Sequence, residues 1–120
     1  MSPSSPNKKI VATYLERDLS KIDSLVADDV EWVEWVDGVP GTGSRNKGKA
    51  AIAQNIGDDR LRNEITRMTE EGNVVIAEGV CHVTRKDGSR LNVRFCNIFE
   101  LENGKIKRQD SFGALLKDSE

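Results

Sequence analysis

The chain has few of the residues from which metal sites are built. His82 is the only histidine among 120 residues, and the two cysteines, Cys81 and Cys96, lack the C-x-x-C spacing of a zinc motif. Because one histidine and two separated cysteines make a poor ligand set, we expect no metal site. The two thiols are expected to be free and buried.

Long apolar runs and an excess of one charge are also missing. The 18 lysines and arginines nearly balance 20 acidic residues, and no basic stripe typical of nucleic-acid binding stands out. No apolar stretch approaches the roughly 20 residues that cross a bilayer, and the first residues, MSPSSPN, lack the apolar core of a signal peptide. We therefore expect a soluble, cytoplasmic protein that binds neither nucleic acid nor membrane.

Hydrophobic periodicity predicts helices in the first half of the chain. A helix from Lys8, capped by Ser5 or Asn7, should bury Tyr14 on its apolar stripe and leave Arg17 in solvent. The run VEWVEWV is rich in β-branched and aromatic residues and predicts a strand. The further expected elements are a second helix from about Leu19 to Val26, the strand at 30–36, a Gly/Pro loop at 37–47 and a helix at 49–56.

The second half reads as four strands joined by tight turns. The predicted strands span 62–70, 74–85, 90–101 and 105–115. Helices followed by an antiparallel meander are typical of an α+β domain rather than of an alternating βαβ nucleotide fold. We expect one domain over residues 8–117, flanked by a disordered tail at 1–7 and a short tail at 118–120.

The Asp87–Gly88 dipeptide predicts how two of these strands pair. A two-residue turn there gives the pairs Val80 with Phe95, His82 with Val93 and Glu78 with Asn97, all on one face. On that face the strand at 90–101 presents Leu91, Val93, Phe95, Phe99 and Leu101, so it is the predicted core side, with Asn97 as a polar exception. Glu78 and His82 would then either contact a wet cavity or lie near open sheet ends.

The Asn103–Gly104 turn leaves two registers open for the last strand. A two-residue turn puts Asp110 on the core face. A three-residue turn with Gly104 in the left-handed conformation puts Gln109 and Ser111 there instead. We favour the second form because its left-handed position falls on glycine.

The element order, with DDVEWVEW at the first strand and FELENGKIKRQDSF at the closing hairpin, resembles the nuclear transport factor two-like superfamily. The chain is most similar to its SnoaL-like group, which also resembles ketosteroid isomerases and limonene epoxide hydrolases. The resemblance covers about residues 8–115. It implies a cone-shaped, strongly curved antiparallel sheet wrapped around N-terminal helices (a cystatin-like α+β barrel), a hydrophobic pocket inside, and a homodimer formed through the outer sheet face.

The predicted register also assigns residues to the outer sheet face. Its apolar members would be Val75, Ala77, Cys81, Val83, Cys96 and Ile98, with Arg94 and Glu100 available for rim contacts. A monomer would hardly expose so many apolar side chains, which agrees with the implied dimer.

The resemblance also assigns roles to individual residues. Glu34 falls where ketosteroid isomerases keep their carboxylate base, and Asn97 where they place an acid that donates to the oxyanion. Ile10 takes the place of their tyrosine donor, with Tyr14 one turn further on. The Asp-Arg-Asp set of the epoxide hydrolases is replaced by Val80, Glu78 and Ser111. These departures from the two patterns argue against ketosteroid isomerisation and against epoxide hydrolysis by the known mechanism.

We predict that the pocket binds a small apolar or carbonyl-containing molecule, with Glu34 as base, Asn97 as amide donor and His82 or Glu78 as the group that returns the proton. A carboxylate among apolar side chains takes up protons more readily than one in water, which suits proton abstraction. The predicted pocket residues are Tyr14, Trp32, Val36, Glu78, Val80, Val93, Phe95, Phe99, Gln109 and Ser111. Isomerisation, cyclisation or dehydration beside a carbonyl would need no cofactor. The alternative is a non-catalytic ligand-binding or protein-interaction module of the same fold.

Overall fold

The computed structural model describes residues 5–36, 43, 45–50 and 60–116. Its elements are α1 (Pro6–Tyr14), α2 (Leu19–Leu25), β1 (Val26–Val36), β2 (Arg45–Lys47), β3 (Arg60–Glu71), β4 (Val74–Thr84), β5 (Arg90–Glu102) and β6 (Lys105–Leu115). The predicted helix at 49–56 and much of the predicted loop at 37–47 lie outside the described residues, as do most of the two predicted tails. β1 begins at Val26, four residues before the predicted start of its strand, directly after α2 ends at Leu25.

Each of the two short helices is capped at its N-terminus by a polar residue. Ser5 caps α1 by accepting a hydrogen bond from the Lys8 backbone N–H at 3.1 Å, and Pro6 suits the first helical position because it has no N–H that would lack an acceptor there. Asp18 caps α2 in the same way, at 3.0 Å from the Ser20 nitrogen. The chain reverses between the helices with Arg17 in the left-handed region, at φ 61°.

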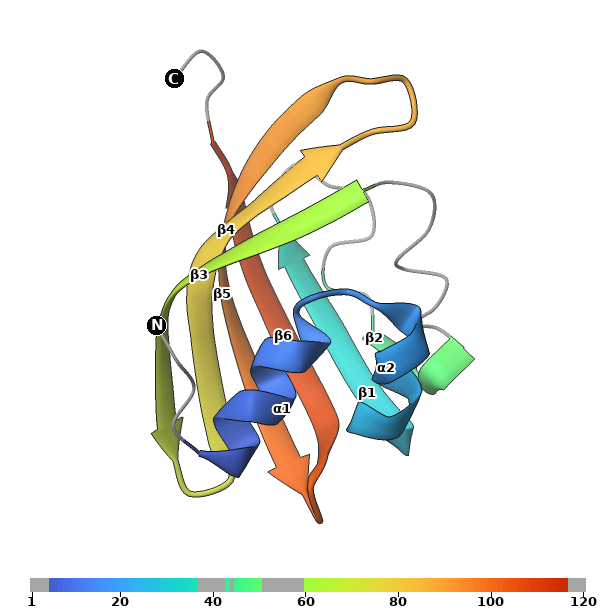
Figure 1. Ribbon diagram of the computed structural model, residues 1–120, viewed down its shortest axis with the longest axis vertical. Helices are drawn as coiled ribbons and strands as arrows, with labels where there is room; N and C mark the ends of the chain where they lie inside the picture. Colours follow the sequence, from blue (N-terminus) through green and yellow to red (C-terminus); the bar gives the residue numbers. More distant parts are fainter. Residues whose placement is uncertain (1–4, 37–42, 44, 51–59, 117–120) are drawn as a thin grey trace.

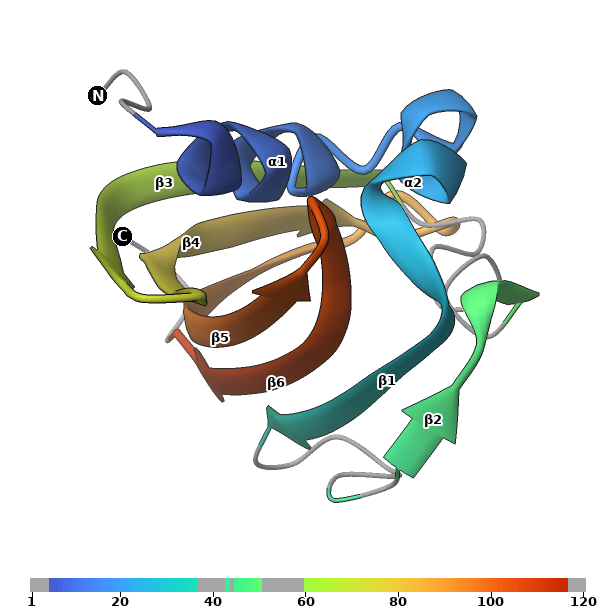
Figure 2. The same cartoon turned by 90° about the horizontal axis from the view of Figure 1, so that it is seen from below.

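Six strands form one curved, unclosed sheet in the order β2-β1-β6-β5-β4-β3. All neighbours are antiparallel except β1 and β6, which run parallel, so the predicted meander has one parallel strand added to it. Figure 1 shows α1 and α2 in front of the sheet, and Figure 2 shows the sheet curling round beneath them. The predicted α+β architecture is confirmed, and its concave face is the side covered by the helices.

The core fills the space between α1 and this concave face. Val11 and Tyr14 of α1 are buried against Phe99 and Ile106, and the Tyr14 and Phe99 rings meet edge to face at 5.7 Å. An edge-to-face pair of this kind adds about 0.5–1.5 kcal/mol to the burial of its two rings. The contact fixes α1 over β5 and leaves the other end of the concave face uncovered by α1.

The predicted register between β4 and β5 is wrong by one residue. Gly79 lies opposite Phe95, and Val80 lies opposite Arg94. The cause is the turn, because Arg85 and Ser89 pair by a 2.8 Å backbone hydrogen bond and the chain turns through three residues, with Gly88 at φ 89°. A shift of one residue moves every side chain of a strand to the other face of the sheet.

Consequently the two faces of β4 are exchanged relative to the prediction. Val75, Ala77, Cys81 and Val83 lie on the concave side, where Val75 and Ala77 are fully buried, so none of them belongs to the outer face. The residues that β4 turns outward are Val74, Ile76, Glu78, Val80 and His82. Cys96 and Ile98 of β5 stay on the outer face, as predicted.

The last hairpin has the two-residue turn but, beyond its first pairs, neither of the registers that the sequence left open, because Asn97 lies opposite Ser111. Asn103 and Gly104 form a two-residue turn with φ values of 53° and 75°, so the favoured three-residue turn is wrong. The pairing then shifts by one residue between Glu100 and Leu101. This bulge restores the predicted orientation of Gln109 and Ser111 toward the concave side.

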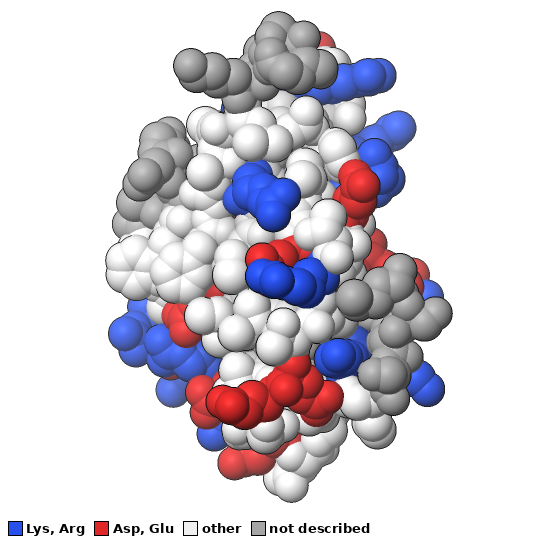
Figure 3. Space-filling model, turned by 90° about the vertical axis from the view of Figure 1, so that its left-hand side faces the viewer, with Lys and Arg blue, Asp and Glu red and all other residues white. Residues whose placement is uncertain are grey.

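The described residues contain no helix long and apolar enough to span a membrane. On the side of the molecule shown in Figure 3, basic and acidic side chains are interspersed with uncharged ones.

Gly79 is required by the close approach of β3, and its replacement should destabilise the fold. A Cβ atom at this position would overlap the Glu64 carbonyl oxygen and lie 3.0 Å from Phe95 Cζ. We expect Gly79→Ala to lower the free energy of unfolding by about 2–4 kcal/mol in chemical denaturation, because backbone atoms cannot move aside cheaply. Thr69→Ala, at an exposed position of the same hairpin, is the matched control. Equal stability of the two variants would contradict this account.

Candidate functional site

A cavity of about 350 Å³ opens on the concave face of the sheet beside the junction of α1 and α2. Its apolar walls are formed by Leu15, Leu61, Val83, Leu91, Val93 and Phe95. The polar side chains that reach it are Arg17, Glu34, Asn63, Cys81, Arg85, Asn97, Gln109 and Ser111. Apolar walls with a few convergent polar groups are typical of sites for small organic molecules.

Several of the predicted site residues line this cavity, and others are buried in the core next to it. Those that line it are Glu34, Val93, Phe95, Asn97, Gln109 and Ser111. Tyr14, Trp32 and Phe99 are buried in the adjoining core. The side chain of Val36 lies outside the described set.

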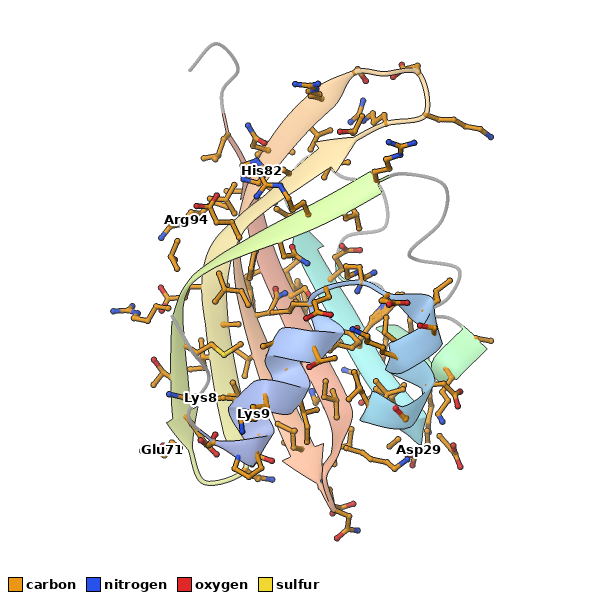
Figure 4. The ribbon with its side chains drawn as sticks, in the orientation of Figure 1. Lys8, Lys9, Asp29, Glu71, His82 and Arg94 are labelled. Atoms are coloured by element: carbon orange, nitrogen blue, oxygen red, sulfur yellow. The ribbon has the colours of Figure 1, made fainter. Side chains whose placement is uncertain are left out.

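Glu78, Val80 and His82 do not reach the cavity, so their predicted places in the pocket are wrong. The cause is the one-residue register shift, which turns all three to the outer face. His82 contacts Asn92 Oδ1 at 2.8 Å and Glu64 Oε1 at 3.0 Å, while Arg67 donates to Glu78 at 2.6 Å. Figure 4 labels His82 in the upper part of the sheet, away from both helices.

A chain of hydrogen bonds leads from the core to the cavity. The Tyr14 hydroxyl donates to Gln109 Oε1 at 2.6 Å, and Gln109 Nε2 donates to Ser111 Oγ at 2.6 Å. Burial of the phenol raises the pKa of Tyr14 above its ordinary value, although the neighbouring Arg17 charge partly opposes this effect. Tyr14 is therefore a neutral donor, and it fixes the orientation of the Gln109 amide.

Glu34 reaches the cavity because β1 pairs in parallel with β6. Its register partner is Ser111, so both residues point to the concave side. The Glu34 carbonyl accepts a 2.6 Å hydrogen bond from the Gly43 N–H, which holds the end of β1 in place. The carboxylate is half-buried beside apolar walls, as the sequence predicted for a candidate base.

Arg17 is the functional candidate that sequence reasoning missed, because it was assigned to the solvent face of the first helix. The helix ends at Tyr14, and the left-handed conformation at Arg17 turns its side chain toward the cavity. The guanidinium carbon lies 5.7 Å from the centroid of the Tyr14 ring. Its Nε is buried and has no hydrogen-bond partner within the described part of the chain.

One signal in the sequence could have identified Arg17. Helices commonly end with glycine or asparagine in the left-handed conformation, and neither occurs between α1 and α2. Another residue must therefore adopt that conformation, at a cost of about 1–2 kcal/mol. An arginine that keeps this unfavourable backbone conformation suggests that the position of its side chain is what matters.

Asn97 contributes a second polar atom without a partner. The residue is only 8% exposed, and its Oδ1 forms no hydrogen bond with any residue that the structure describes. It lies opposite Ser111 across the β5–β6 ladder, with Phe95 and Phe99 on either side along its own strand. A buried carbonyl oxygen left without a donor costs about 1–3 kcal/mol, so it marks a place where a ligand can stabilise the protein.

A larger depression, of about 700 Å³, lies elsewhere on the surface and is a weaker candidate. Most of its lining is charged, including Asp28, Glu31, Glu102, Lys105 and Arg108. Several of these charges are already paired with one another, as in the 3.1 Å contact between Arg108 and Glu31. Among the residues described, no group of three or more histidine, cysteine or acidic side chains is arranged to hold a metal ion.

Comparison with known families agrees with this geometry. The SnoaL-like domain family matches residues 8–109, which is most of the chain. The protein belongs to the SnoaL-like family. The comparison with curated proteins found no match.

Solved structures share the fold of this SnoaL-like chain. A nuclear transport factor two-like protein of unknown function from Burkholderia pseudomallei is 23% identical, with a TM-score of 0.73 and 90% of each chain covered. An epoxide hydrolase of the limonene epoxide hydrolase-like kind from M. tuberculosis is 20% identical, with a TM-score of 0.75 over 90% of this chain and 82% of that one. TerC, co-crystallised with polyporic acid, is 26% identical, with a TM-score of 0.67 over 90% and 91%.

Tyr14 should titrate at higher pH in the folded protein than in the unfolded chain. It is the only tyrosine, so the ultraviolet absorbance of phenolate reports this residue alone. Because burial favours the neutral phenol, we expect the native midpoint above that measured in guanidinium chloride. A pKa raised by folding stabilises the protein at lower pH, and this contribution is lost as the pH rises through the native midpoint. Coincident midpoints would contradict the buried placement of Tyr14.

Proposed function

We propose that this SnoaL-like protein binds a small carbonyl compound in the concave cavity and removes a proton from the carbon beside the carbonyl. The observation that carries the proposal is the meeting of the Glu34 carboxylate, the Arg17 guanidinium and the Asn97 amide in one cavity with apolar walls. A base and groups that stabilise an oxyanion are the two requirements of enolate chemistry.

In the proposed step the Glu34 carboxylate accepts the proton from carbon. The electron pair of the broken C–H bond forms the C=C bond of an enolate, and negative charge passes to the carbonyl oxygen. Arg17 and the N–H of Asn97 stabilise that oxygen. Because His82 and Glu78 face outward, Glu34 itself returns the proton to another carbon in an isomerisation, or the enolate attacks a second carbonyl in a cyclisation.

A related structure supports a small organic ligand. TerC, which shares 26% identity and nearly the whole length of this chain, was crystallised with polyporic acid. An oxygen-bearing organic molecule of this kind agrees with a cavity that combines Arg17 and Asn97 with apolar walls.

Removal of the base should abolish proton transfer while leaving the cavity intact. We expect the wild-type protein to accelerate exchange of the α-protons of 2-tetralone in D₂O, followed by NMR, and Glu34→Gln to slow this exchange about 100-fold or more. Glu100→Gln, which removes a carboxylate from the outer face of β5, is the matched control.

The outcome of the exchange experiment distinguishes an acid/base enzyme from a ligand-binding module. A Glu34-dependent rate supports an acid/base enzyme. Binding of 2-tetralone without acceleration, or acceleration that persists in Glu34→Gln, would sink the catalytic proposal and leave a ligand-binding module.

We also propose that two copies associate through the outer sheet face. Its partly exposed apolar residues are Val74, Ile76, Val80, Cys96, Ile98 and Phe112. Phe112 stacks on Trp35 at 6.4 Å, although the two residues are 41% and 46% exposed. An exposed apolar area of this kind is typical of an interface.

The association can be tested at the centre of that face. We expect wild-type protein to sediment as a dimer and Ile98→Lys to shift it to a monomer, because a charge there would have to be buried without a partner. Ile98→Val keeps the surface apolar and should remain dimeric. A monomeric wild-type protein at micromolar concentration would contradict the proposal.

A further inference from the structure

Among the described residues, the two buried polar atoms without partners at the cavity have opposite hydrogen-bonding character. Arg17 Nε is a donor on a permanently charged group, and Asn97 Oδ1 is an acceptor on a neutral amide. Both residues line the same cavity. They are therefore not two copies of one binding function, and together they restrict what a ligand must present.

Arg17 is held at the cavity by its surroundings and by its backbone. Its guanidinium lies over the Tyr14 ring, and Tyr14 is fixed in turn by its hydrogen bond to Gln109. The neighbouring residues Glu16 and Leu15 continue the end of α1 through backbone hydrogen bonds to Thr13 and Val11. The cation is therefore presented to the cavity from a fixed position rather than from a free surface side chain.

Asn97 is positioned just as firmly. It occupies the centre of β5, between Ala77 of β4 and Ser111 of β6, with apolar residues before and after it on the same face. Its Oδ1 has no hydrogen-bond donor there among the described residues. The site is built to receive a hydrogen-bond donor.

We propose that the ligand carries one oxygen with negative charge, which Arg17 binds, and a separate neutral hydroxyl, which donates to Asn97 Oδ1. The chemical class is an acidic hydroxylated carbonyl or aromatic compound. This inference rests on the proposed function, since it names the substrate class of the same cavity. It also gives the ligand a direction, because its anionic oxygen lies near Arg17 and its hydroxyl near Asn97 Oδ1.

The test uses three compounds of similar size as probes of the full chain, by isothermal titration calorimetry. The first, 6-hydroxy-2-naphthoate, has both a carboxylate and a neutral hydroxyl. The second, 2-naphthoate, lacks the hydroxyl, and the third, 2-naphthalenemethanol, lacks the negative charge. We expect affinity to fall in that order.

Variants then assign each preference to its residue. Arg17→Gln should weaken binding of both naphthoates by roughly 10- to 100-fold and leave 2-naphthalenemethanol unchanged. Asn97→Leu should weaken 6-hydroxy-2-naphthoate by roughly 5- to 10-fold and leave 2-naphthoate unchanged. Arg94→Gln, on the exposed outer face of β5, is the control for the loss of one positive charge.

A footprint on the free thiols places the bound probe. Cys81 lines the cavity and Cys96 faces outward, so bound 6-hydroxy-2-naphthoate should slow alkylation of Cys81 by N-ethylmaleimide and leave Cys96 unaffected. Because Asn97 is buried, circular dichroism and thermal unfolding confirm that Asn97→Leu is folded. If Asn97→Leu is not folded, Asn97→Asp is used instead, because it keeps an acceptor but repels anions. This variant should no longer bind the two naphthoates and should still bind 2-naphthalenemethanol.

The outcomes distinguish this inference from the function beneath it. Probes that bind, protect Cys81 and are insensitive to Arg17→Gln would overturn the inference and leave the proposed function standing. Failure of every probe and of 2-tetralone to protect Cys81 would overturn both. Glu34→Gln should abolish exchange but bind 2-naphthoate at least as tightly as wild type, because it removes a like charge.

Discussion

Side chains alternate strictly between the two faces of a strand, and every functional assignment in this protein depends on that constraint. The concave face of the sheet is the only side that α1 and α2 cover within the described part of the chain, so a residue's parity decides whether it meets the cavity or solvent. Two local irregularities set the parity. The left-handed Gly88 lengthens one turn, and the bulge between the Glu100 and Leu101 pairs shifts the register of β6.

The cavity that results leaves two polar atoms of the described residues without hydrogen-bond partners. Most polar groups around it are satisfied within the protein, as in the chain from Tyr14 through Gln109 to Ser111. Arg17 Nε and Asn97 Oδ1 are left over among the described residues, and α1 ends in a strained arginine where glycine would cost less. A protein that keeps such costs in one small volume is organised around something that it binds.

The sequence was sufficient to predict the architecture, because architecture follows from coarse patterns. The apolar stripe around Tyr14, the β-branched run before Asp37 and the glycine-containing turns each survive an error of one residue. Asn97 lines the cavity, as the apolar alternation of its strand predicted, and Glu34 lines it as the family resemblance implied.

Finer placements failed where one residue mattered. The Asp87–Gly88 pair is compatible with turns of two or three residues, and only the tertiary structure selects between them. That choice carried Glu78 and His82 from the expected pocket to the outer face, where Arg67, Glu64 and Asn92 bind them. The orientation of Gln109 was right although its turn was wrong, because a bulge compensated for the error. Arg17 was misplaced because periodicity describes a helix and not the residue that follows it; the absence of glycine or asparagine after α1 was the signal that periodicity does not capture.

The parallel pairing of β1 with β6 has a consequence for biosynthesis. Strand β6 lies between β1 and β5, so the first strand of the chain has its principal neighbour in the last. The wall that carries Glu34 therefore cannot be completed until Ser111 has left the ribosome, and contacts this distant in sequence form slowly. A nascent chain holds Glu34 on a strand whose β6-facing edge stays unpaired until β6 has been synthesised, and this wall of the cavity forms only when β6 docks.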